Sequence, residues 1–60
     1  MIYDKIKKIA QEKGISIMAL EQKANLGNGT IGKWKNSDPG VGKIKAVAEV
    51  LEVKLEELIG

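Results

Sequence analysis

Between Asn28 and Asn36 the chain carries amide, hydroxyl and ammonium side chains whose chemistry is the recognition of a polar partner. The Asn28 amide can form two hydrogen bonds to an adenine edge, and the Lys33 ammonium group can reach guanine or a phosphate. Each also has an ordinary alternative, since Asn28 can cap a helix and Lys33 can be a solvated surface residue. All ten basic residues are lysines, which lack the rigid fork with which arginine reads guanine. If the partner is double-stranded DNA, we therefore expect recognition to depend more on A·T base pairs and on the shape of the duplex than on guanine contacts.

Catalytic chemistry finds little support in the 60 residues. The chain has no Cys, His or Arg, no glycine-rich phosphate loop after a strand, and no nucleophile paired with a base. Ser16 suits a helix cap better than a nucleophile, and Glu56 and Glu57 are adjacent, so on a helix they point apart. We therefore expect that the protein is not an enzyme and binds no cofactor. We also expect no metal site, because the thiolate and imidazole ligands that zinc prefers are missing.

Charge is divided unevenly along the chain. Residues 1–45 hold nine lysines and four acids, a net charge of +5, whereas residues 46–60 hold one lysine and four acids, a net charge of −3. A basic region on a small protein favours a polyanionic partner, although an ordinary solvated surface would have the same composition.

Length and hydropathy limit the remaining possibilities. We expect residues 1–60 to form one module with a small core. No apolar run approaches the roughly 18–20 residues that span a bilayer. The N-terminal residues lack the apolar region of a signal peptide. These features, with the absence of cysteine, lead us to expect a cytoplasmic protein.

Apolar residues recur at helical spacing almost throughout, which predicts five short helices and no strand. The first begins near Ile2 and ends at Lys13-Gly14, because glycine suits the left-handed residue after a helix. Ser16 is placed to cap a second helix from Ile17 to about Ala24. The apolar residues of the other three are Ile31 and Trp34 in a helix over 28–36; Val41, Ile44, Val47, Ala48 and Leu51 in a fourth; and Leu55, Leu58 and Ile59 in the last.

The segment from Ser16 to Asn36 predicts two short helices joined by the tight turn Asn25-Leu26-Gly27. Asn25 is expected to adopt the left-handed conformation that asparagine tolerates best after glycine, and Leu26 to fill the gap between the helices. Leu20, Ala24, Ile31 and Trp34 would bury the inner faces and leave the outer face of the second helix polar. This is the geometry of a helix-turn-helix, whose second helix can lie in a DNA major groove.

Two further local patterns carry predictions. Val53 and Leu58 fit a hydrophobic staple around Lys54, with Glu57 placed to cap the last helix through its carboxylate. Gly29 and Gly32 each cost a helix about 1 kcal/mol relative to alanine. Either close approach to DNA or tight packing within the fold explains them equally well.

Four segments of the chain together form a family pattern. They are Tyr3-Asp4-Lys5-Ile6-Lys7, Lys13-Gly14-Ile15-Ser16, Asn28-Gly29-Thr30-Ile31-Gly32-Lys33-Trp34-Lys35-Asn36 and Val53-Lys54-Leu55-Glu56-Glu57-Leu58-Ile59-Gly60. Through these segments the whole chain resembles the phage-repressor/Cro-type (XRE-like) helix-turn-helix family, especially small bacterial and phage repressor domains. The resemblance implies an all-α, compact five-helix lambda-repressor-like domain with a central helix-turn-helix at about 16–36. It also implies sequence-specific binding of double-stranded DNA by a transcriptional repressor or regulator.

The resemblance also implies which residues of this chain touch DNA. The base edges would be read from the start of the helix over 28–36, and phosphates would be bound around it. The residues implied are Asn28, Gly29, Thr30 and Lys33 at base edges, and Ser16, Ile17, Lys35, Asn36 and Lys43 at phosphates.

The chain departs from the family pattern at six positions, two of which are Gly40 and Gly42, where polar residues are usual near the start of the fourth helix. Asn25 stands where glycine is usual in the turn, and Gly27 where a serine cap is usual. Before the last helix, Glu52 replaces a usual glycine and Lys54 a usual cap, which weakens the prediction of that helix and its boundaries.

Binding to two half-sites predicts a homodimer on DNA, with the acidic and apolar C-terminal helix as the first candidate for its contact. The alternative function is a protein-interaction module on the same fold, such as an antitoxin or a regulatory adaptor. That alternative predicts an exposed apolar patch, whereas convergence of Lys33, Lys35 and Lys43 on one face would favour DNA.

Overall fold

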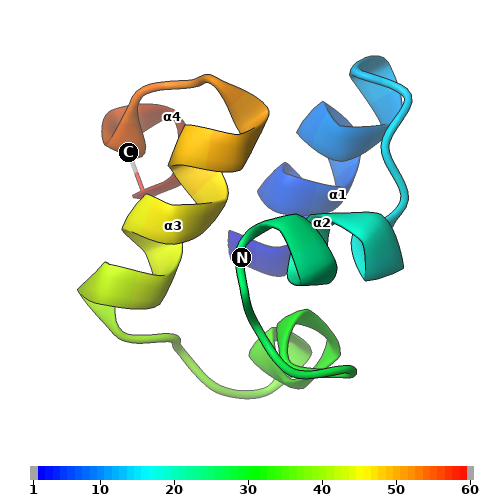
Figure 1. Ribbon diagram of the computed structural model, residues 1–60. Coiled ribbons are helices and arrows are strands. Elements are labelled where there is room, and N and C mark those ends of the chain that lie inside the picture. The colour runs from blue at the N-terminus through cyan, green and yellow to red at the C-terminus, as the bar shows by residue number, and fades with distance from the viewer. Residues whose placement is uncertain (1, 60) are drawn as a thin grey trace.

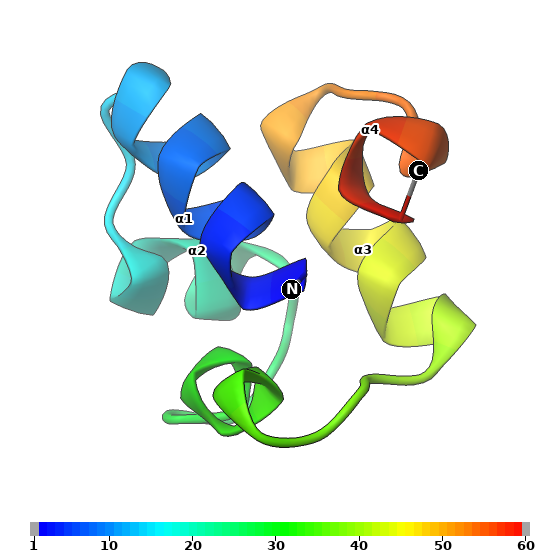
Figure 2. The same cartoon turned by 180° about the vertical axis from the view of Figure 1, so that it is seen from behind.

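The computed structural model describes residues 2–59, in which four α-helices and one short 3-10 helix follow one another (Figures 1 and 2). The helices are α1 (Ile2–Glu12), α2 (Ile17–Lys23), η1 (Ile31–Lys35), α3 (Val41–Leu51) and α4 (Leu55–Ile59), of which η1 is the 3-10 helix. No strand occurs among the described residues, so the all-α prediction is confirmed. Met1 and Gly60, the ends of the predicted 1–60 module, lie outside them.

The helices enclose one apolar core to which all five elements contribute. In Figure 1, α3 and α4 lie on one side, α1 and α2 on the other, and η1, in green, at the lower end. η1 packs on α1, while α3 contacts both α2 and α4. Trp34 is only 4% exposed, as its spacing from Ile31 predicts. The buried core residues are Ile6, Ala10, Leu20, Ile31, Trp34, Ile44, Val47, Ala48, Leu51 and Leu58.

The apolar stripe predicted for α3 is correct except at its first residue. Ile44, Val47 and Leu51 are buried, but Val41 is 62% exposed. Val41 begins α3 directly after Gly40, three residues before the first buried position of the helix. It therefore lies past the edge of the core.

The predicted third helix over residues 28–36 is wrong in type and length. Only Ile31–Lys35 is helical, as a 3-10 helix, and residues 28–30 form a turn. Gly29 has a φ of +82°, which no α-helix contains, and the Asn36 N–H donates to the Lys33 carbonyl three residues back. The five expected helices are thus four α-helices and a 3-10 helix.

Three helices end in the same Schellman turn, each with a different residue in the left-handed conformation. The φ angles are +72° at Gly14, +61° at Asn25 and +58° at Glu52. At each turn the next residue's N–H donates to a carbonyl five residues back, and the left-handed residue's N–H to one three residues back. The left-handed conformation predicted for Asn25 is therefore confirmed. Glu52 is the strained member, because its Cβ crowds the backbone there.

Replacing Glu52 by glycine is expected to stabilise the protein. Removing Cβ from a left-handed residue relieves about 1–2 kcal/mol, partly offset by the greater freedom of glycine in the unfolded chain. We expect a net gain of about 0.5–1 kcal/mol, seen as a rise in Tm of roughly 3–6 °C for a chain of this size. Asn25→Gly is the matched control and should gain less, because asparagine tolerates this conformation. An unchanged or lower Tm for Glu52→Gly would contradict the assignment.

The last helix begins with the cap that its sequence predicts. The Lys54 backbone N–H donates to the Glu57 carboxylate at 2.9 Å, and Val53 packs against the core that contains Leu58. This hydrogen bond satisfies the backbone N–H at the start of α4, although lysine at position 54 has no side-chain oxygen with which to cap the helix. α4 accordingly forms over Leu55–Ile59, although it is only five residues long. Within residues 2–59, none of the helices has the length and apolar character that crossing a membrane requires.

Candidate nucleic-acid interface

The start of α2 is held by the serine that the sequence marks as its cap. Ser16 has extended backbone angles, and its hydroxyl accepts a hydrogen bond from the Ala19 backbone N–H at 3.1 Å. Ser16 is exposed and Ile17 half-buried, so α2 begins at the surface with one apolar side chain turned inward. Of the phosphate contacts implied at this end, Ser16 presents a polar group, whereas Ile17 offers only its backbone and an apolar side chain.

The turn after α2 directs the chain toward η1. The Leu26 N–H donates to the Glu21 carbonyl at 2.7 Å, and the Asn25 N–H to the Gln22 carbonyl at 3.1 Å. Leu26 is half-buried and packs against the core, as predicted for the apolar residue of the turn. The turn at Asn25 and Leu26 is therefore formed by hydrogen bonds between residues close together in the sequence.

Glu21 is a buried carboxylate that connects α2 to the segment before η1. Its side chain is 4% exposed, and it is the only buried charged residue among those described. One carboxylate oxygen accepts from the Gly29 N–H at 3.2 Å and the other from the Ile31 N–H at 2.9 Å. Because it spans both donors, Glu21 positions the backbone on both sides of Thr30.

Sequence analysis did not identify Glu21 as a site residue, although its position in the sequence indicates that it is buried. It lies four residues after Ile17 and three before Ala24, on the inward stripe of α2. A glutamate on such a stripe needs hydrogen-bond partners, because a buried charge is costly without them. The identity of those partners depends on the tertiary fold.

The 3-10 geometry of η1 determines which side chains share a face. Side chains three residues apart eclipse one another in a 3-10 helix, so Thr30, Lys33 and Asn36 form one row. Lys33 and Asn36 are exposed, and Thr30 is half-buried. We call Thr30, Lys33 and Asn36 the polar row. Three of the side chains predicted to touch DNA therefore stand in line along η1.

Lys35 lies on a different face of η1 from the polar row. Its Nζ stands over the Tyr3 ring of α1, 5.0 Å from the ring centroid, within cation–π range. Lys33 and Lys35, which the sequence analysis expected on one face, therefore lie on two different faces of η1. Lys35 contacts α1 through Tyr3, whereas Lys33 is exposed at the middle residue of η1.

Asn28 and Gly29 belong to the turn before η1 and not to a helix. The residue at the N-cap position of η1 is Thr30, so Asn28 does not cap η1, and both Asn28 and Gly29 are exposed. A Cβ at Gly29 or Gly32 would meet no atom within 4 Å, which argues against tight packing in the fold as the reason for either glycine. Gly29 is explained by its positive φ, whereas Gly32 has no such requirement.

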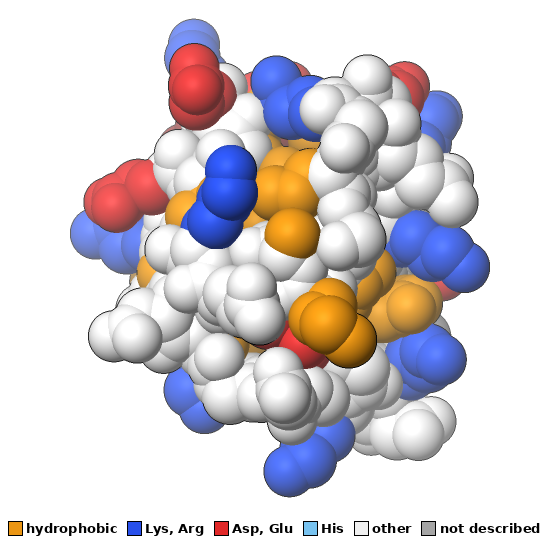
Figure 3. Space-filling view, turned by 45° about the vertical axis from the view of Figure 1, so that its right-hand side comes forward, with side chains coloured by type: hydrophobic (Ala, Val, Ile, Leu, Met, Phe, Trp, Pro, Cys, Tyr) orange, Lys and Arg blue, Asp and Glu red, His pale blue; other side chains and the backbone are white. Residues whose placement is uncertain are grey.

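The surface around η1 carries lysines, and the opposite end of the molecule carries lysines and acidic side chains together. In Figure 3 lysines stand along the lower edge, where η1 lies, and also toward the top, beside the acidic side chains. Lys43 is exposed in the first turn of α3, which lies at the same end of the molecule as η1 (Figure 1). The charge division along the sequence is only partly a division in space, because lysines of α1 lie beside acidic residues from the end of the chain, as Lys8 does in a hollow with Glu57.

Comparison with protein families agrees with this geometry. Residues 5–60 match the model of the Cro/C1-type HTH DNA-binding domain, which is nearly the whole chain. The chain belongs to the Cro/C1-type helix-turn-helix family. The resemblance seen in the sequence is thereby confirmed, and with it DNA binding by a domain that is not an enzyme. No curated protein and no solved structure shows a significant match.

In this Cro/C1-type domain, η1 follows α2 after the Asn25 turn and the turn over residues 28–30. Seven of the nine predicted contact residues are exposed, and Ile17 and Thr30 are half-buried. The exposed seven are Ser16, Asn28, Gly29, Lys33, Lys35, Asn36 and Lys43.

Proposed function

We propose that this Cro/C1-type domain binds double-stranded DNA sequence-specifically and acts as a transcriptional repressor or regulator, with residues 16–36 as its helix-turn-helix. The observation that carries the proposal is the polar row, whose backbone at Gly29 and Ile31 is bonded to the Glu21 carboxylate of α2. A short helix with its polar side outward can enter the major groove, where base edges present distinct hydrogen-bonding patterns.

Within this proposal the contact residues fall into two groups. Asn28, Gly29, Thr30 and Lys33 face base edges, because they belong to the turn and to the first part of η1. The remaining residues neutralise or bond phosphates, which position the protein on the duplex without reading sequence. Ser16, Ile17, Lys35, Asn36 and Lys43 form this second group.

The open space at Gly32 leads to a prediction that separates folding from binding. Gly32→Ala is expected to stabilise the fold by about 0.5–1 kcal/mol, since alanine is the better helix former and nothing obstructs its Cβ. If the bare backbone of η1 lies against DNA, the same substitution weakens binding. Thermal denaturation and a duplex titration of one preparation test both. Unchanged affinity in a stabilised variant would show that Gly32 does not approach DNA.

The function is tested by selecting duplexes from a random pool with the purified protein at two salt concentrations. Enrichment of one sequence supports specific recognition, and affinity should fall with salt with a log–log slope near −0.9 per phosphate neutralised. A homodimer on DNA predicts an enriched sequence with twofold symmetry and half-sites roughly 34 Å apart. Failure to bind any duplex at low salt would refute the proposal.

An alternative function, a protein-interaction module such as an antitoxin or regulatory adaptor, is favoured by one observation. Met18, near the start of α2, is 63% exposed. Methionine is common at adaptable protein contacts. If no duplex is bound, a Met18→Glu variant compared with wild type in binding to a candidate protein partner tests this alternative.

A further inference from the structure

Asparagine is followed by glycine at one place in the chain, Asn28-Gly29. The Gly29 backbone nitrogen, once it has lost its proton, can attack the side-chain amide carbon of Asn28 and close a succinimide ring. Glycine has no side chain to obstruct this attack, and its backbone rotates more freely than that of any other residue. The chemistry of the pair therefore favours deamidation without an enzyme.

The pair lies at the surface, in the turn before η1. Both residues are exposed, and a Cβ added at Gly29 would meet no atom within 4 Å, so water and hydroxide can reach the reacting groups. The Thr30 N–H donates to the Gly27 carbonyl at 3.1 Å and closes the turn, in which Gly29 has a φ of +82°. Positive φ at the third residue of such a turn is typical of type II. Hydrogen bonds, and not packing, therefore hold the pair in place.

One of these hydrogen bonds engages the atom that must react. The Gly29 N–H donates at 3.2 Å to a carboxylate oxygen of Glu21, eight residues earlier on α2. While this bond is made, the nitrogen keeps its proton, because the nearby negative charge opposes formation of an amide anion. The ring can close only when the bond breaks and the turn opens, which is a local opening of the fold. The lifetime of Asn28 thus depends on a tertiary contact as well as on its neighbour.

We propose that Asn28-Gly29 is a site of spontaneous modification, at which deamidation removes the base-reading amide at a rate set by the Glu21 carboxylate. In the first step hydroxide takes the Gly29 amide proton, the nitrogen bonds to the Asn28 side-chain carbon, and ammonia leaves with a proton from water. In the second step water opens the ring at either carbonyl and leaves aspartate or isoaspartate. Nothing is oxidised or reduced, and water is the only reactant consumed.

The consequence for recognition rests on the proposed function. The Asn28 amide offers a donor and an acceptor to an adenine edge, whereas aspartate offers only acceptors and a negative charge that the phosphates repel. Isoaspartate also carries the backbone through its Cβ, which lengthens the chain directly before the Gly29 N–H. Both products therefore lose the base contact, and isoaspartate also displaces the turn from Glu21.

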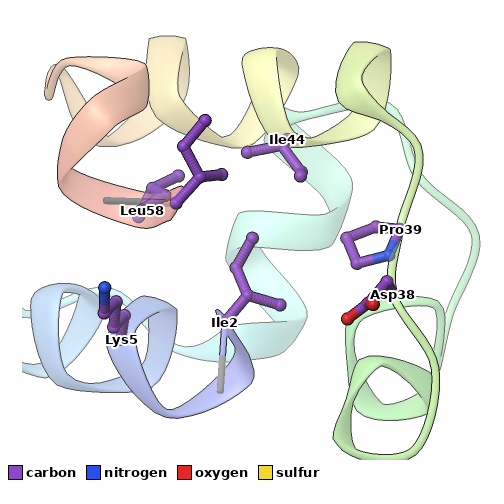
Figure 4. Close-up of a pocket in the computed structure, with 7 residues that line it drawn as sticks. Ile2, Lys5, Asp38, Pro39, Ile44 and Leu58 are labelled. Atoms are coloured by element: carbon purple, nitrogen blue, oxygen red, sulfur yellow. The ribbon is translucent and has the colours of Figure 1, made fainter.

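The two other asparagines of the chain are internal references. The Leu26 N–H that follows Asn25 donates to a backbone carbonyl at 2.7 Å, and the leucine side chain obstructs attack by its nitrogen. Asn36 is exposed like Asn28, but it precedes Ser37 at the start of the loop before α3, part of which Figure 4 shows. The two Glu21 carboxylate oxygens bond in the segment before η1 and not in this loop. Modification at Asn36 is therefore independent of Glu21.

Peptide mass spectrometry of protein aged at mildly alkaline pH without DNA measures aspartate and isoaspartate at each asparagine. In wild type, conversion should be faster at Asn28 than at Asn36. Glu21→Gln should raise the Asn28 rate about tenfold, because its one remaining oxygen pairs with the buried Ile31 N–H and leaves the Gly29 N–H free. The rate at Asn36 should stay unchanged in this variant.

Ile44→Val is the matched control, because it lowers stability through the core and leaves the Glu21 hydrogen bonds in place. Denaturant unfolding shows whether both variants are folded under the conditions of ageing. Equal acceleration at Asn28 in both variants would show that global unfolding, and not the Glu21 contact, controls the reaction. The proposal would also be overturned by wild type modified no faster at Asn28 than at Asn36, or by a glutamine variant modified no faster than wild type.

The modified protein, separated from unmodified protein by ion exchange, tests the consequence for recognition. Its affinity for the selected duplex should fall about tenfold or more, and its affinity for random duplexes should fall less. Unchanged affinity for the selected duplex would refute that consequence. Because the rates are measured without DNA, their failure is distinct from failure of the duplex-selection experiment.

Discussion

Replacing Glu21 by alanine is expected to destabilise the protein by about 2–4 kcal/mol, because two backbone N–H groups then lose their acceptor. The Ile31 N–H is buried and the Gly29 N–H partly buried, so water replaces the carboxylate poorly. A chain of this length has a total stability of about 3–9 kcal/mol, so the loss is a large fraction of it. Denaturant unfolding measures the loss directly.

Two further variants make the Glu21 prediction specific. Glu21→Gln keeps one oxygen acceptor and loses the other, so its destabilisation should fall between wild type and alanine. Gln22→Ala alters the neighbouring exposed residue of α2 and should change stability by less than about 0.5 kcal/mol. If Glu21→Ala and Gln22→Ala have the same free energy of unfolding, the Glu21 carboxylate does not stabilise the turn before η1.

Hydrogen exchange at individual amides separates a local effect from a global one. In the glutamine variant, the Gly29 and Ile31 amides should exchange faster than amides of α3, because the change loosens the segment before η1 first. The same variant should bind selected duplexes less specifically, since Asn28 and Thr30 lie within that segment. Uniformly faster exchange would indicate that Glu21 supports the whole core.

Removing the Asn28 and Lys33 side chains together is expected to abolish sequence preference while leaving weak, salt-sensitive DNA binding. A bidentate amide–adenine contact contributes about 1–3 kcal/mol of discrimination, and a lysine contact to guanine a similar amount. The double variant should therefore bind the selected duplex at least tenfold more weakly and bind random duplexes almost as before. Both residues are exposed, so the protein should remain folded.

The single variants decide what each residue contacts. If Lys33 binds a phosphate, Lys33→Ala weakens all duplexes alike and reduces the salt slope by about 1. If Lys33 reads a base, the loss is confined to the selected sequence. Lys8→Ala is the matched control, since Lys8 lies with Glu57 in a hollow between α1 and α4 and away from η1. A double variant that keeps full sequence preference would refute the assignment of the turn and η1 to base recognition.

Local sequence was sufficient to predict most of the helices and the residues that begin and end them. Ser16 and Glu57 cap their helices as their spacing predicts, and Asn25 is left-handed because few other residues tolerate that conformation. The burial of Trp34 follows from its spacing with Ile31. The caps and the left-handed turn depend on interactions within a few residues, so the pattern of residue types determines them.

The kind of helix at the candidate site was decided by tertiary structure. The sequence predicts an α-helix over 28–36, but Gly29 turns to positive φ, and its N–H and that of Ile31 bond to a carboxylate eight and ten residues earlier. That contact exists only once α2 and η1 are in place. The resulting 3-10 geometry sets Thr30, Lys33 and Asn36 in one row and turns Lys35 toward Tyr3.

The remaining features that the sequence did not predict depend on the packing of distant elements. Val41 fits an apolar stripe by spacing, yet it is exposed because the core ends before the first turn of α3. A surface hollow lined by Lys5 and Asp38 (Figure 4) exists because α1, α3 and α4 meet around residues far apart in the chain. Sequence alone therefore determined the four α-helices, the caps at Ser16 and Glu57 and the residue types offered to a partner. Which of those residues share a face was decided by long-range contacts, because neighbours in space are set by packing and not by spacing.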